Sequence, residues 1–194
     1  MILPTFLLPM WHIQLTAPQY PEGLELKIWF NHLSGDISTI NDLNHYIGMK
    51  KIIASEIPEL RLLTPLIVSV VILLVLVFFI RKKWLLLISY IYYLGMAVYG
   101  FYDFWSWEFD YGHHLDPHAA IKIPGMNYQP PLIGYKQLLN FTSYSYPDVG
   151  GMLLMGAGVL LFLIVCNEYF FHKKSDHHVR KHPAGAGNTI AAVH

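Results

Sequence analysis

The sequence predicts an all-α membrane protein with three clear transmembrane helices, a shorter fourth span at the N-terminus and two ordered extracytoplasmic segments. Composition is the first observation: 54% of the 194 residues are hydrophobic and only 13% are charged, whereas a soluble domain carries about 25% charged residues. Three long apolar runs are the second. The third is that the segments between these runs are polar, aromatic and rich in histidine, as expected of parts outside the hydrocarbon core.

The three apolar runs cover residues 62–80, 84–102 and 150–171. Each is close to the about 20 residues that an α-helix needs to cross a bilayer. Pro65 falls in the first turn of the first span, where a missing N–H costs little. Asp148 is placed to cap the third span. The glycines that follow it predict close packing against a neighbouring helix.

The N-terminal segment 1–15 is apolar but short, and Pro4 and Pro9 interrupt it. Fourteen helical residues reach only about 21 Å, against a hydrocarbon core of about 30 Å. We expect a short first span or membrane anchor, with an interfacial segment as the alternative.

Basic residues orient the spans. Arg81, Lys82 and Lys83 fill the turn between the first two spans, and Lys173 and Lys174 follow the last. Cytoplasmic loops are enriched in such residues. We therefore expect a multi-pass protein of the bacterial inner membrane, with a cytoplasmic histidine-rich tail at 172–194. The segments 16–61 and 103–149 then both lie in the periplasm.

Local patterns give some detail within the two outer segments. Hydrophobic residues alternate from Leu24 to Phe30, which favours a short strand. Ser38 is placed to cap a helix through Tyr46, which Gly48 would end. In the second segment, five prolines and five glycines between Asp103 and Gly151 favour an ordered irregular loop over regular secondary structure.

The second outer segment also carries a cluster of metal-binding residue types. His113, His114, Asp116 and His118 lie within six residues. Imidazole binds copper, zinc, iron and nickel, so this group is a candidate metal site. Its spacing matches no fixed zinc signature. The alternative is that these are polar loop residues that hold a turn before Pro117.

Residues outside this cluster could complete the site. His45 lies in the expected helix of the first segment, Met49 follows four residues later, and Met126 lies in the second segment. Thioether sulfur selects Cu(I), so a mixed histidine and methionine site would indicate copper. The alternative is a solvated histidine and packed methionines.

Several classes of function are disfavoured. The net charge of zero gives no basic field for nucleic acid. The single cysteine, Cys166, excludes an intrachain disulfide and a CxxC metal site. No catalytic motif occurs, so we do not expect an enzyme. Histidines are absent from the three long apolar runs, which disfavours a haem held between helices.

Three strings carry a family resemblance: APQYPEGLELKIW at 17–29, INDLNHYIGMKKI at 40–52 and DPHAAIKIPGMNYQPPLIGYKQLLNF at 116–141. They resemble small bacterial integral-membrane accessory proteins of the nitrous oxide reductase (nos) gene cluster type. The resemblance implies support of the maturation or copper supply of a periplasmic copper enzyme such as nitrous oxide reductase. Copper, that enzyme or its maturation proteins, and membrane lipid would be the partners. The residues carried over are Asn44, His45, Met49, His118 and Met126.

A rival interpretation remains open. The protein could be a membrane anchor or electron-transfer subunit that docks a periplasmic redox partner. A transporter is disfavoured, because the spans contain almost no polar groups at depth.

Overall fold

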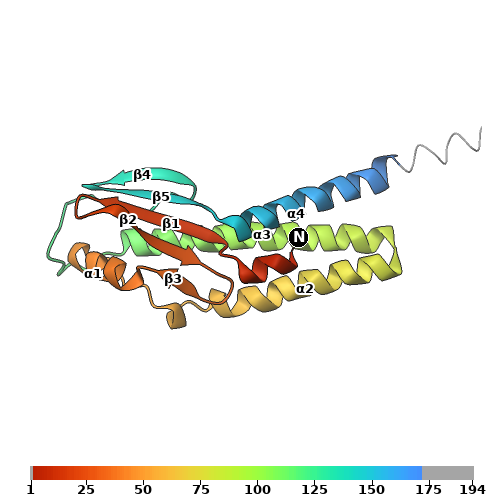
Figure 1. Cartoon of the computed structure of the whole chain (residues 1–194), viewed down its shortest axis with the longest axis horizontal. Coiled ribbons are helices and arrows are strands. Elements are labelled where there is room, and N and C mark those ends of the chain that lie inside the picture. The colour runs from red at the N-terminus through yellow and green to blue at the C-terminus, as the bar shows by residue number, and fades with distance from the viewer. Residues whose placement is uncertain (1, 172–194) are drawn as a thin grey trace, which may run out of the picture.

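The computed structural model describes residues 2–171, and the tail predicted at 172–194 lies outside this range. Long helices occupy one end of the molecule, and a five-stranded antiparallel sheet with a small helix occupies the other (Figure 1). The prediction of an all-α fold was therefore wrong. The prediction of three helices suited to a membrane is supported by their length and composition.

The three long helices are α2 (Glu59–Ile80), α3 (Lys83–His113) and α4 (Val149–Cys166), and a π-helical turn η3 (Asn167–Phe171) extends α4. Each is long and apolar enough to cross a membrane. Large hydrophobic side chains project from all three into the surroundings, including Phe79 at 73% exposure and Val98 at 69%. A surface of this kind is suited to lipid rather than to water.

Helix α3 is longer than a membrane is thick. Its 31 residues span about 46 Å at 1.5 Å a residue, whereas the hydrocarbon core measures about 30 Å. Asp103 is the first charged residue after the basic turn at its start, so the part that is apolar enough to cross a membrane is 84–102. The remaining turns extend past this part, and their Trp107 and Tyr111 pack against the core of the sheet.

The sheet contains β1 (Trp11–Ala17), β2 (Tyr20–Ile28), β3 (Leu33–Gly35), β4 (Gly134–Leu138) and β5 (Phe141–Pro147), in the order β3-β2-β1-β5-β4. Ile13 of β1 lies opposite Leu26 of β2 and opposite Ser145 of β5. The two outer segments are thus joined in one sheet.

Two sequence expectations need correction here. The segment 1–15, expected to form a helical span or anchor, forms the short 3-10 helix η1 (Leu3–Leu7) and then most of strand β1. The segment expected to be an irregular loop contains the β4–β5 hairpin. Pairing with distant strands satisfies the backbone of both segments, which local composition does not reveal.

Helix α1 (Ile37–Ile47) covers one face of the sheet. The predicted helix is confirmed, although it begins after Asp36 rather than at Ser38. Gly48 ends it with φ of 79°, a left-handed conformation that glycine adopts without strain. A short 3-10 turn, η2 (Ala54–Glu56), then leads to α2.

The N-terminal segment joins the sheet to the helices. Ile2 is buried in one hydrophobic cluster with Ile67 of α2 and Tyr93 of α3. Asp148 caps α4 by accepting a hydrogen bond from the backbone N–H of Val149 at 2.6 Å, as expected. A Cβ on Gly150 would lie 2.7 Å from the carbonyl oxygen of Pro9. The predicted close packing of the glycines therefore occurs: Gly150 packs against the N-terminal segment, whereas Gly158 packs against the neighbouring helix α3, where its Cβ would lie 2.9 Å from the Tyr93 ring.

Candidate functional site

The last turn of α3 presents His113 and His114 to solvent. The ring of His113 stacks on Phe109 with a centroid distance of 4.0 Å, and its Nδ1 lies 3.0 Å from the Phe109 carbonyl oxygen. Nδ1 of His114 lies 2.7 Å from Oδ1 of Asp110. Both rings are thus oriented by neighbours within their own helix, and both remain exposed.

Asp110 connects His114 to the segment after α1. Its second carboxylate oxygen accepts a hydrogen bond from Nζ of Lys50 at 2.6 Å. This hydrogen bond from Lys50, more than the contact with His114, lowers the pKa of the Asp110 carboxyl. Nearby, the hydroxyl of Tyr111 donates to the carbonyl of Lys51 at 2.9 Å. The projecting end of α3 is therefore fastened to residues 50–51.

The segment after α3 is fastened to the end of α1 as well. The backbone N–H of Asp116 donates to the Gly48 carbonyl at 2.8 Å, and that of Ile121 donates to the Tyr46 carbonyl at 2.9 Å. Asp116 in turn accepts a hydrogen bond from the backbone N–H of His118 at 2.8 Å. The segments that carry His45 and Met49 and those that carry Asp116 and His118 are thus neighbours.

The side chains of the predicted metal set are not gathered into one cluster. Within residues 2–171, no three or more His, Cys, Asp or Glu side chains lie close enough to hold a metal ion. Met49 lies against a cavity inside the domain, and Met126 is half-buried in a turn closed by its N–H and the Ile123 carbonyl. Metal binding by this set stays a prediction.

A cavity of about 370 Å³ lies between the sheet, α1, the projecting end of α3 and the segment after it. Its wall is mainly apolar, with side chains such as Leu24, Leu26 and Ile40. Volumes of this order are typical of small-molecule sites.

Glu108 is the acidic residue in this wall. Its side chain is fully buried, and neither carboxylate oxygen has a hydrogen-bond partner among the described residues. Burial raises the pKa of the Glu108 carboxyl to about 8. The Tyr128 hydroxyl, in the same wall, is also buried and without a partner. The cavity therefore holds two polar groups that the protein leaves without partners.

The sequence analysis did not single out Glu108 or Tyr128, although one signal was available for the glutamate. Phe104, Trp107, Glu108 and Tyr111 share one face of α3 at the spacing i, i+3, i+4 and i+7. The three aromatic residues pack into the sheet core. A charged residue on an otherwise apolar helix face marks a group whose burial has to be explained.

A second buried polar group lies on the other face of β1. His12 is 7% exposed, and its Nδ1 lies 2.9 Å from the Tyr146 hydroxyl. Asp148 is 3.9 Å away from the same nitrogen. These contacts connect β1 to β5 and to the start of α4, so we assign His12 a structural role where the sheet meets the helices.

Comparisons with protein-family models, with curated proteins and with solved structures found no match to this chain.

Proposed function

We propose that this protein is an accessory protein of the bacterial inner membrane that supports copper supply to, or maturation of, a periplasmic copper enzyme such as nitrous oxide reductase. In this proposal the long helices cross the inner membrane and the sheet end lies in the periplasm. Copper is cargo, and lipid and the copper enzyme or its maturation proteins are the partners.

The observation that carries the proposal is the attachment of the segment after α3 to the end of α1. The hydrogen bonds from Asp116 to Gly48 and from Ile121 to Tyr46 place the candidate ligands His45 and His118 on adjacent segments. Both side chains are exposed, so both are accessible to an arriving copper ion. Imidazole and thioether donors favour copper in its reduced form.

The orientation of the chain agrees with this role. The turn between α2 and α3, which holds Arg81, Lys82 and Lys83, lies at the end of the helical hairpin that is away from the sheet (Figure 1). The bias of basic residues toward the cytoplasm places that end inside the cell. The candidate ligands at the opposite end then face the periplasm.

Metal analysis tests the proposal. The full chain, purified in detergent, is loaded anaerobically with Cu(I), dialysed and analysed for copper per protein. Replacing His113, His114 and His118 together by alanine should lower this ratio, because the substitution removes three imidazoles from one segment. It should also lower the copper content of co-produced nitrous oxide reductase.

The matched control is His32→Ala, since His32 is an exposed histidine of the β2–β3 connection. It should leave both copper contents unchanged. Unaltered copper in the triple variant, with normal loading of the reductase, would contradict the copper-supply proposal.

One observation favours the rival function, docking of a periplasmic redox partner. The outer face of the β4–β5 hairpin exposes Tyr135, Tyr144 and Tyr146, at 74%, 41% and 39%. Tyrosine is enriched at protein interfaces. Replacing Tyr135 and Tyr144 by serine should weaken co-purification of the reductase without changing copper per chain. An unchanged yield of the complex would contradict docking through this face.

A further inference from the structure

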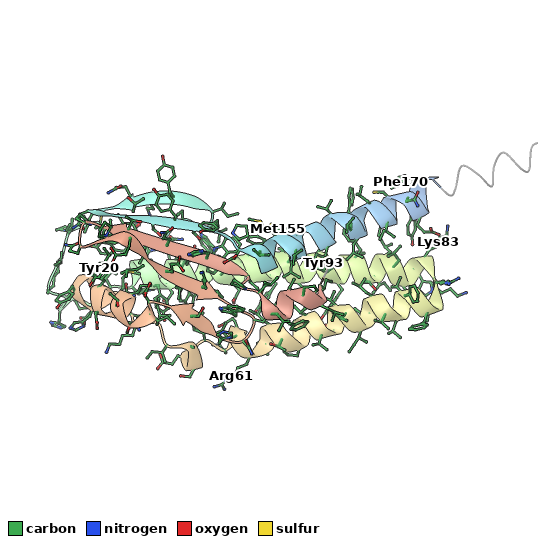
Figure 2. All side chains as sticks on the ribbon, in the orientation of Figure 1. Tyr20, Arg61, Lys83, Tyr93, Met155 and Phe170 are labelled. Atoms are coloured by element: carbon green, nitrogen blue, oxygen red, sulfur yellow. The ribbon has the colours of Figure 1, made fainter. Side chains whose placement is uncertain are left out.

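The cavity beside Glu108 opens at the end of the domain that is remote from the membrane helices. Five of the wall residues are exposed and mark its mouth: Gln19 between β1 and β2, Tyr46 at the end of α1, Ile121 after α3, and Leu139 and Asn140 in the β4–β5 turn. Tyr20, also in the wall, lies at the opposite end of the molecule from Lys83 (Figure 2). A ligand would thus enter from water rather than from the bilayer.

The polar groups of the cavity define what such a ligand must supply. A buried polar group without a partner costs several kcal/mol relative to its hydrated state. Both carboxylate oxygens of Glu108 and the Tyr128 hydroxyl are in this condition. A ligand that donates hydrogen bonds to the carboxylate would remove this cost.

Charge excludes one class of ligand. Among the described residues that line the cavity there is no lysine, arginine or histidine. A phosphate or carboxylate group would meet Glu108 with no opposite charge beside it. Anionic ligands, fatty acids among them, therefore do not fit.

The aromatic wall favours a cation. Trp107 and Tyr111 pack against each other with a centroid distance of 4.3 Å, and both line the cavity with Tyr128. A cation over an aromatic face is attracted by the negative charge density of the ring. Isoleucine and leucine side chains complete the wall and suit an apolar body.

We propose that this cavity binds a small hydrophobic organic cation, with its ammonium group on Glu108 and its apolar body against the aromatic and aliphatic wall. None of the histidines of the candidate copper site lines this cavity, although Met49 does. The cation site therefore stands whether or not the protein handles copper.

Three probes with the same apolar body test the proposal on the unmodified protein: phenethylammonium, phenethyl alcohol and phenylpropanoate. The full chain in lipid nanodiscs is titrated by calorimetry at about pH 9, above the pKa of about 8 of the Glu108 carboxyl, so that this group is ionised. Empty nanodiscs serve as the blank. We expect the ammonium to bind at least about tenfold more tightly than the alcohol, because a hydrogen bond to a charged group contributes about 1.5–3 kcal/mol. The carboxylate should show no saturable binding.

Glu108→Gln then assigns the preference to one side chain. This substitution should lower the affinity for the ammonium about tenfold or more, because the amide keeps the shape of the carboxylate but not its charge. The affinity for the alcohol should stay within about twofold of the wild-type value. Glu56→Gln is the control, because Glu56 is exposed and outside the cavity wall. Each of four results would overturn the proposal. The three probes bind equally, the alcohol is preferred, the ammonium shows no saturable binding, or the preference for the ammonium survives in Glu108→Gln.

Discussion

The substitution Glu108→Gln keeps the size of a fully buried side chain and removes its ionisation. In the folded protein, burial raises the pKa of this carboxyl from its ordinary 4.5 to about 8. A raised acid pKa means that the folded state holds its proton more tightly than the unfolded state does. We therefore expect the wild-type protein to lose stability, relative to the glutamine variant, as pH rises.

These two pKa values give the direction of the stability change and the pH range in which it occurs. Below about pH 4.5 the carboxyl is protonated in both states, and wild type and variant should differ least. Between about pH 4.5 and about pH 8 only the unfolded state releases its proton, so the wild type is progressively destabilised. The difference between 4.5 and about 8, at 1.36 kcal/mol for each pKa unit, limits the effect to about 5 kcal/mol.

Thermal unfolding in detergent, followed by circular dichroism from about pH 5 to about pH 9, measures this effect. For a chain of this size, about 5 kcal/mol corresponds to a difference in midpoint on the order of 10 °C. The variant should have the higher midpoint, and its advantage should grow up to about pH 8 and then level off. Glu56→Gln, at an exposed site, should show no such trend. A difference between wild type and Glu108→Gln that stays constant across this range, or that shrinks as pH rises, would refute the reasoning.

The remaining predictions concern the packing between the N-terminal segment and α4, and the orientation of the chain in the membrane. Gly150→Ala should lower the thermal midpoint, at a cost of about 1–3 kcal/mol, because its Cβ would lie 2.7 Å from the Pro9 carbonyl oxygen. Gly95→Ala is the control, since its Cβ would meet nothing within 4 Å, and an equal loss in both would count against the packing argument. Reporter fusions after Lys83 should read cytoplasmic, and those at Ser34 and Asn127 periplasmic, because basic residues fill the turn before α3. A cytoplasmic signal at Asn127 would contradict the periplasmic site.

The membrane helices could be predicted from the sequence because their signal is local. An uncharged run such as 62–80 has few other ways to satisfy its backbone and its side chains. The end of α1 was predictable for a similar reason, since Gly48 takes a backbone conformation that other residues adopt with strain. In both cases the determining residues lie within one element.

The sheet could not be predicted in the same way. Trp11 of β1 pairs with Pro147 of β5, and no local pattern reports a partner so far along the chain. Strand β5 also reverses the usual alternation: Ser143 and Ser145 are fully buried, whereas Tyr144 is exposed. Small polar residues on the inner face gave this strand the composition of a loop.

In the candidate sites, too, local features could be predicted from the sequence, whereas features that depend on distant segments could not. The histidines 113, 114 and 118 are neighbours in sequence, yet Phe109 and Asp110 orient the rings of His113 and His114 separately. His118 lies in the turn after α3, where its backbone N–H donates to Asp116. Glu108 lies in the same stretch, and local sequence gives no sign that it lines a cavity. The rest of the cavity wall comes in part from β1, β2 and residues Ile121, Tyr128 and Pro130, which are distant in sequence or follow after a long turn.

The pairing of β1 with β5 has a consequence for the order of assembly. During synthesis the β1–β2 hairpin emerges first, but its partner strand follows only after α2 and α3. Until α2 and α3 have been made and the chain has returned to the sheet, one edge of β1 has unpaired N–H and C=O groups that another strand could bind. Completion of the sheet is therefore a late, long-range step, and such steps are slow. Whether β1 pairs with β5 or with a strand of another chain is decided only at that stage.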